Sequence, residues 1–297
     1  MNSPPRPIQI KPAGLLVSIL LFGIPASIFF ISLNLIVPGM VTARMPWFLI
    51  YNLCLVLPLA ILLVAAFVGY RIEAGTYNRI AIAERFRLRP MKFKDWLWAI
   101  GLAIFMYGGN HSAPISFVFA CLALLFEGGE NWQRNLFLSA FILLFLFASY
   151  ELWRTEPFLS RFVIHLKSDS LIEFMKHFGP SDFMGFPMRG NWWILGYYLV
   201  VLLVFNIGGE ELWWRGYILP RQELAFGKVA WIVNGILWAC FHIFIHSTLF
   251  DLVRMMPTCL ALAYVVQRTK NTWTGIIGHT IGNSPLLVQI LQGILQT

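Results

Sequence analysis

Charge is what this chain of 297 residues has least of. Charged side chains make up 12% of the sequence, about half the share of an ordinary soluble domain, which is roughly 25%. Hydrophobic residues reach 58% and the mean hydropathy is +0.70. The apolar stretches are too long for strands and do not alternate, which argues against a barrel of strands. The sequence therefore predicts an all-α, multi-pass integral membrane protein, a bundle of about eight transmembrane helices.

Cysteine is also scarce. The four cysteines lie within apolar segments and form no C-x-x-C pair, so neither a disulfide framework nor a thiolate metal site is indicated. The sequence has no H-E-x-x-H motif, no internal repeat and no low-complexity tract. We expect no nucleotide or organic cofactor.

Negative charge is the rarer sign, and the net charge is +8. The basic residues lie in short links between apolar segments, where positive charge marks the cytoplasmic side of a membrane. We therefore attribute the charge to topology and expect no nucleic-acid partner. The basic segment 71–95 is predicted to be cytoplasmic, with its alternating stretch Arg85–Arg89 lying solvated along the lipid headgroups. The expected location is the cytoplasmic membrane of a bacterium.

The expected helices follow from the apolar stretches. They are 14–38, 47–70, 96–126 with a break at 108–114, 135–153, 192–206, 229–250, 252–266 and 272–295. The connection 154–191 is predicted to be an amphipathic surface segment. This count places the end of 192–206 on the outer side, whereas Arg215, Arg221, Lys228, Arg268 and Lys270 favour the cytoplasm. The side of the membrane stays open.

The stretch 208–217, Gly-Gly-Glu-Glu-Leu-Trp-Trp-Arg-Gly-Tyr, places charge at the end of an apolar run. In a helix Glu211 and Arg215 are four residues apart and face each other, while Glu210 points about 100° away. Glu210 is thereby left without the arginine as a partner. The competing explanation is an interfacial ion-pair cluster at a helix end.

Two later apolar segments carry histidine. His242 and His246 are four residues apart in Trp238–His246, and His279 and Asn283 have the same spacing in Gly278–Asn283. Singly, each membrane histidine is explained by an interhelical hydrogen bond. Together with the glutamates, they predict a shared polar cavity in the last third of the chain. A free carboxylate there can act as general base on water, and the imidazoles can bind a metal or stabilise an oxyanion.

These residues resemble a known family in both order and spacing. The three motifs are Glu210-Glu211-x-x-x-Arg215, Trp238-x-x-x-His242 and His279-x-x-x-Asn283. They are similar to the signature of the CPBP (Abi) family of intramembrane endopeptidases, which includes the type II CAAX prenyl proteases. The resemblance covers the part from 192 to the end, so residues 192–297 are expected to form the catalytic core and 1–191 an N-terminal membrane region.

The resemblance implies that Glu210 activates water, with Glu211 and Arg215 in support and His242, His279 and Asn283 completing the site. It implies hydrolysis of a peptide bond, in or beside the bilayer, in a membrane-associated peptide or protein, with or without a prenyl group. Whether zinc takes part is left open by the sequence, with His242, His279 and Asn283 as its candidate ligands.

Two other functions use similar residues. A non-catalytic bacteriocin-immunity or scaffold protein would keep the motifs for packing alone. A transporter with a proton relay also places Glu and His in membrane helices, but it would show two related halves, and the chain has no such repeat.

Overall fold

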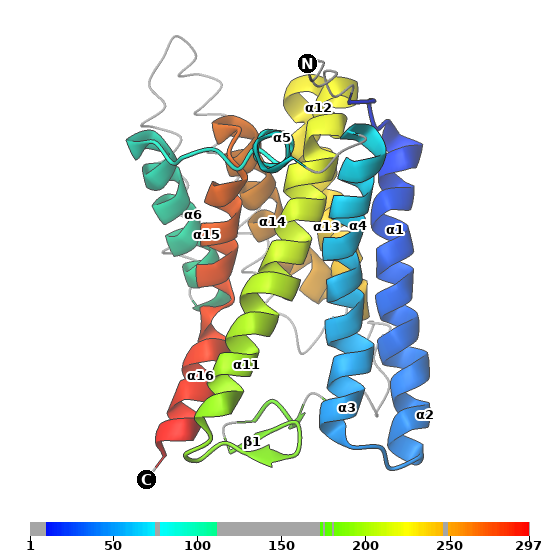
Figure 1. Cartoon of the computed structure of the whole chain (residues 1–297), viewed down its shortest axis with the longest axis vertical. Coiled ribbons are helices and arrows are strands. Elements are labelled where there is room, and N and C mark those ends of the chain that lie inside the picture. The colour runs from blue at the N-terminus through cyan, green and yellow to red at the C-terminus, as the bar shows by residue number, and fades with distance from the viewer. Residues whose placement is uncertain are drawn as a thin grey trace, which may run out of the picture.

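The structure is a computed structural model, and it describes residues 10–74, 78–111, 173–174, 176–179, 181–245 and 249–296. Its described part is a bundle of helices with one two-stranded sheet at the lower end (Figure 1). The predicted all-α membrane fold is thereby confirmed. Within these described residues, three stretches are long and apolar enough to cross a bilayer: Leu15–Thr42, Trp47–Ala74 and Trp192–Phe241. The predicted span 135–153 lies outside the described residues.

The N-terminal helical hairpin forms as predicted. Its first arm consists of α1 (Leu15–Ile31), the π-helical turn η1 (Ser32–Ile36) and α2 (Val37–Thr42), and its second arm of α3 (Trp47–Tyr51), η2 (Asn52–Val56) and α4 (Leu57–Ala74). Pro58 lacks the N–H that would bond the carbonyl of Cys54. The hydroxyl of Ser32 donates to that carbonyl across the hairpin at 2.9 Å.

The basic segment after α4 differs from its prediction, which placed its arginines in solvent. Short helix α5 (Arg79–Arg85) is followed by a strap, residues 85–89, and by α6 (Phe93–His111). The strap does not lie solvated among headgroups, because Arg85 and Phe86 are buried. Arg87 instead pairs with Glu223 at 2.7 Å. The alternation of arginines with apolar residues is compatible with the lipid headgroups and with the protein interior, because a buried arginine needs only a hydrogen-bonding or charged partner.

The long helix that carries the two glutamates rises from the lower end of the bundle to the upper end (Figure 1). It comprises α11 (Trp192–Val200), η4 (Val201–Gly208), η5 (Glu211–Ile218) and α12 (Leu219–Phe226). The glutamates therefore lie in the middle of a continuous helix and not at the end of one. Two stretches of this helix are π-helical, a wider winding that is found most often at functional sites.

The remaining helices follow the long helix in the chain. They are α13 (Ala230–Phe241), which follows the 3-10 turn η6 (Gly227–Val229), then the turn η7 (His242–Phe244), α14 (Leu249–Thr269), α15 (Thr272–Gly282) and α16 (Ser284–Leu295). The predicted single span 272–295 is thus two helices. Asn283 separates them, and Pro285 at the first turn of α16 has no N–H with which to continue α15.

The direction of the helices corrects the predicted count of crossings. The count had 96–126 and 192–206 running the same way, but α6 descends from the upper end and α11 returns to it (Figure 1). The strap therefore lies at the same end as α12 and the α14–α15 link. Arg87 and Lys270 both pair with Glu223 there. Arg87 and Lys270, which conflicted in the sequence, therefore lie at one end of the bundle.

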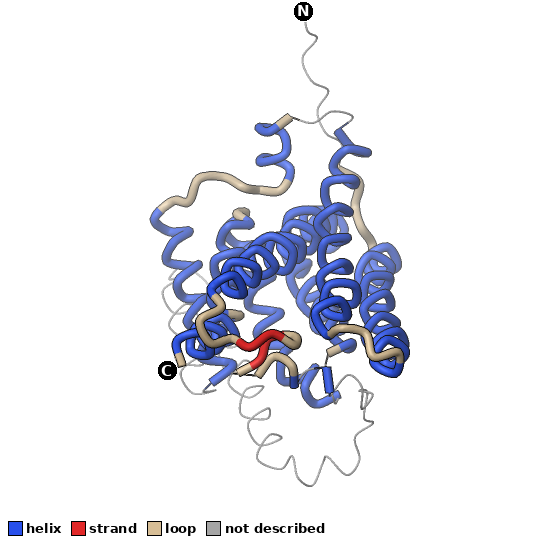
Figure 2. The backbone as a smooth tube through the Cα atoms, turned by 60° about the horizontal axis from the view of Figure 1, so that its bottom comes forward, coloured by secondary structure: helices blue, strands red, loops and turns tan. Residues whose placement is uncertain are grey.

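The connection before α11 contains a β-hairpin that the sequence did not predict. Strands β1 (Asp182–Phe183) and β2 (Phe186–Pro187) pair antiparallel, with Phe183 opposite Phe186. This hairpin lies across the lower end of the bundle (Figure 2). Phe183 and Met184 are fully buried, because their side chains close the end of the apolar core.

Glycine allows the helices around the site to approach closely. A Cβ at Gly209 would lie 2.9 Å from the backbone oxygen of Leu59 in α4. A Cβ at Gly278 would lie 2.5 Å from the side chain of Leu102 in α6. These crossings press α4 and α6 against the helices that carry Glu210 and His279.

Candidate active site

Glu211 is the centre of a buried ion pair. Its Oε1 accepts a hydrogen bond from Arg215 Nη1 at 2.9 Å, and neither side chain has any exposed surface. The predicted pairing of these two residues along one helix is what the structure shows. The same oxygen is 2.9 Å from Nδ1 of His279 on α15. One carboxylate oxygen therefore joins the long helix to α15.

Glu210 faces a different set of partners. Its Oε2 accepts a hydrogen bond from the indole Nε1 of Trp238 on α13 at 2.8 Å. Its Oε1 accepts one from the amide of Asn206, four residues earlier on the same helix, at 2.9 Å. The residue is 3% exposed. Two neutral donors thus hold the carboxylate in place and leave it lone pairs for a water molecule.

Trp238 brings the remaining groups together. The guanidinium of Arg215 lies 3.8 Å above the centre of its ring, a cation–π contact in a desolvated place. The rings of His242 and His279 approach its edge, with centroids at 4.9 and 5.2 Å. The indole therefore touches every motif of the site.

His242 is held at the end of α13. Its Nδ1 lies 2.8 Å from the backbone oxygen of Trp238, and its Nε2 is 3.9 Å from Oε2 of Glu210. Two hydrogen bonds of about 2.8 Å can meet at one oxygen atom across such a separation. His242 and Glu210 can therefore hold the same water molecule. His246, which shares the predicted helix face, lies outside the described residues.

Asn283 lies one helical turn after His279. It caps the end of α15, and its backbone N–H donates to the carbonyl of His279 at 3.0 Å. Its Nδ2 donates to Oδ1 of Asn206 at 3.0 Å. Asn283 thus reaches the site through Asn206 and Glu210.

The hydrogen bonds decide which nitrogen of each histidine carries a proton. A backbone carbonyl only accepts, so Nδ1 of His242 is the donor. An ionised carboxylate also only accepts, so Nδ1 of His279 donates to Glu211. A neutral ring then offers an Nε2 lone pair, and a cationic ring offers an Nε2–H.

The formal charges of the cluster do not cancel. Glu210 and Glu211 carry two negative charges when ionised, and Arg215 carries one positive charge. An excess negative charge in a buried site is costly unless a proton or a counter-charge neutralises it. An imidazolium of His242 or His279 provides one, and so does a metal ion.

A metal fits this donor set only in part. Each histidine has Nδ1 fixed by an oxygen acceptor, as is usual for imidazoles that bind metal through the other nitrogen. Yet no three His, Cys, Asp or Glu side chains are placed to hold one ion within the part of the chain that the structure describes. Asn283, the expected third ligand, directs its amide nitrogen at Asn206. The arrangement as it stands does not complete a three-ligand zinc site.

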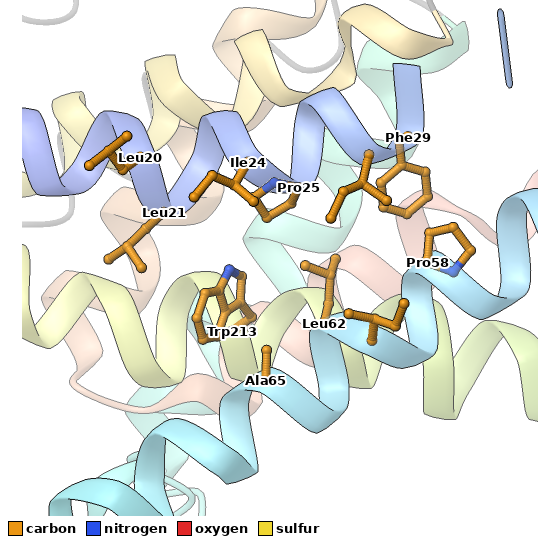
Figure 3. A pocket seen from close by; sticks show the side chains of 11 residues that line it. Leu20, Leu21, Ile24, Pro25, Phe29, Pro58, Leu62, Ala65 and Trp213 are labelled. Atoms are coloured by element: carbon orange, nitrogen blue, oxygen red, sulfur yellow. The ribbon is translucent and has the colours of Figure 1, made fainter. Parts of the chain in front are cut away.

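An apolar cavity of about 290 Å³ lies between α1 and α4, one helical turn from Glu210. Its lining comes from both helices and from Trp213, whose indole closes it on the side of the long helix (Figure 3). Leu20, Ile24 and Ile61 on its rim are exposed on the outside of the bundle. The cavity thus opens where a bilayer would surround the protein.

Two partners of Glu210 were not predicted from the sequence. Asn206 had a usable signal, since it is an amide in an apolar run and stands four residues before Glu210. Trp238 was included as the aromatic of its motif, but the donor role of its Nε1 was not expected. No spacing rule links Trp238 to Glu210, because the contact joins two helices.

A comparison with known families identifies a domain in the last third of the chain. Residues 191–284 match the family described as type II CAAX prenyl endopeptidase Rce1-like. The chain therefore contains an Rce1-like domain, and the resemblance to the CPBP family is confirmed. All three motifs lie within the matched residues. No curated protein and no solved structure matches the chain.

The hydrogen bond from Trp238 to Glu210 generates a stability prediction. Trp238→Phe keeps an aromatic ring but removes the donor, whereas Trp214→Phe removes an equally buried indole whose Nε1 has no hydrogen-bond partner in the described part. Because a hydrogen bond to a charged group contributes about 1.5–3 kcal/mol, Trp238→Phe should lower the free energy of unfolding by that much more than Trp214→Phe. Unfolding in detergent measures both, and equal losses would show that the bond contributes nothing.

Proposed function

We propose that the chain is an intramembrane endopeptidase in which Glu210 activates a water molecule. The observation that supports this most strongly is the environment of Glu210. The carboxylate is buried, is fixed by two donors, and lies across a 3.9 Å gap from an imidazole. The match of residues 191–284 to the Rce1-like family supports a protease role of the CAAX type.

In this proposal Glu210 takes a proton from water as the oxygen attacks the carbonyl carbon of the peptide bond. The proton then passes from Glu210 to the leaving amine nitrogen, so the carboxylate is restored. An imidazolium of His242 or His279 donates Nε2–H to the oxyanion of the tetrahedral intermediate. Glu211 and Arg215 orient His279, and Asn283 and Asn206 orient Glu210.

The proposed substrate is a peptide at the membrane, and its apolar part would lie in the cavity beside Trp213. The fully apolar lining suits an apolar side chain or a prenyl group. We propose residues 192–297 as the catalytic core. The basic end of the bundle would face the cytoplasm, as positive charge usually does, and the membrane would be the cytoplasmic membrane of a bacterium.

The test of the function is Glu210→Gln, which keeps the shape of the side chain and removes its basicity. Because general base catalysis contributes about 10²–10⁴-fold, hydrolysis of a membrane-peptide library should fall by about that factor while the protein still folds. Glu84→Gln on the exposed face of α5 is the matched control and should leave hydrolysis unchanged. If Glu210→Gln cleaves as well as wild type, Glu210 is not the base.

If no peptide of the library is cleaved by the wild-type protein, the non-catalytic immunity or scaffold function is favoured instead. Such a protein would tolerate Glu210→Gln in its own biological assay, since the glutamine keeps the shape of the side chain and an oxygen that accepts one of the two hydrogen bonds.

The second form of the proposal is a mechanism assisted by a zinc ion. His242 and His279 through Nε2, and Asn283 through its amide oxygen, would hold the ion, which would polarise the peptide carbonyl. We expect chelator-treated protein, with no metal found by elemental analysis, to retain its activity, because the described donors do not complete the site. Loss of activity on chelation that zinc alone restores would instead establish the metal-assisted form.

A further inference from the structure

Arg85 is a buried arginine that contacts both the long helix and α4. Its Nη1 donates to the backbone oxygen of Gly216 at 3.0 Å, and its Nη2 donates to that of Tyr217 at 3.1 Å. Its Nε pairs with Glu73 on α4 at 2.7 Å, and its guanidinium lies 4.7 Å from the centre of the Tyr217 ring. The side chain is 1% exposed.

Pro220 explains why the oxygen of Gly216 accepts from a side chain. The π-helical segment η5 ends at Ile218 and α12 is α-helical from Leu219. Where the α-helical pattern resumes, the oxygen of Gly216 would bond the N–H four residues later, and Pro220 at that position has no N–H. A buried carbonyl that loses its partner is destabilising. Arg85 supplies the donor that Pro220 lacks.

The carbonyls of Gly216 and Tyr217 lie near the end of the π-helical segment η5, which carries Glu211 and Arg215. Winding at this end sets the rotation of the segment about its axis, and therefore where its side chains point. The Arg85 contact at Gly216 is one residue from Arg215. A guanidinium with two fixed donors holds both oxygens at once, as the planar fork of arginine allows.

Phe86, the residue after Arg85, connects η5 to α15. A Cβ at Gly216 would lie 2.9 Å from the ring of Phe86, so this ring is packed directly on the helix. The backbone oxygen of Phe86 accepts from the hydroxyl of Thr272, at the start of α15, at 2.6 Å. Since α15 carries His279, the strap fixes the spacing that the bond between Glu211 and His279 requires.

We propose that Arg85 is a positioning residue for the reaction at Glu210: by replacing the N–H that Pro220 lacks, it fixes the winding of η5 and thus the geometry of Glu211, Arg215 and His279. Arg85 does not touch the reacting atoms. Its role in catalysis rests on the proposed function, and its role in the winding of η5 does not.

The experiment compares Arg85→Gln, Pro220→Ala and the double variant. A small displacement of catalytic groups costs up to about 10²-fold in rate, so Arg85→Gln should lower kcat about 10- to 100-fold with KM within about two-fold. Pro220→Ala restores the backbone donor. The double variant should therefore recover most of the lost kcat, which a general loss of stability would not explain.

Hydrogen exchange gives a readout that does not depend on activity. Amides of residues 211–218 should exchange faster in Arg85→Gln and return toward the wild-type rate in the double variant. Arg79→Gln, an exposed arginine of α5, is the control and should change neither kcat nor exchange. Should Arg85→Gln not fold, Arg85→Lys keeps the charge beside Glu73 but cannot reach both oxygens, and it should show the same effects in weaker form.

The proposal is overturned if Arg85→Gln and Arg85→Lys leave kcat and exchange unchanged. It is equally overturned if the double variant is as impaired as Arg85→Gln, because the restored N–H would then replace nothing. If the wild-type protein hydrolyses no peptide, the proposed function fails, and the exchange data still decide the role of Arg85.

Discussion

The structure around the site depends on one buried carboxylate oxygen. Oε1 of Glu211 accepts from Arg215 on its own helix and from His279 on α15. Two charges without exposed surface are stable only as a hydrogen-bonded pair. Arg215, held in this way, also lies against Trp238, whose Nε1 fixes Glu210. Loss of the pair would leave both charges buried and would release the groups proposed to do chemistry.

The sequence was a good guide to what lies along one helix. The membrane fold followed from long apolar stretches, and the pairing of Glu211 with Arg215 followed from their four-residue spacing. Contacts between helices could not be predicted from the sequence. The bond from Trp238 to Glu210 and the path from Asn283 through Asn206 depend on how α13 and α15 dock on the long helix. Spacing within a motif does not encode that docking.

The basic segment shows the same limit. Counting charges correctly marked residues 71–95 as a link at one end of the bundle, but it treated the arginines as solvated. In the fold Arg85 has partners on α4 and on the long helix. The need for them is visible in the sequence only as Pro220, far along the chain. From sequence alone, an arginine that donates to a backbone carbonyl looks the same as one that only marks the cytoplasmic side of the membrane. The two can be distinguished once the fold places the segments together.

The most direct test of the account is a double-mutant cycle on Glu211 and Arg215. Glu211→Leu leaves Arg215 buried without its carboxylate, and Arg215→Met leaves Glu211 buried without its arginine. Each change should lower the free energy of unfolding by about 3–5 kcal/mol. The double variant leaves neither charge, so its loss should be at least about 2 kcal/mol smaller than the sum of the two. Losses that add to within about 0.5 kcal/mol, as they do for independent sites, would contradict the central role of this pair.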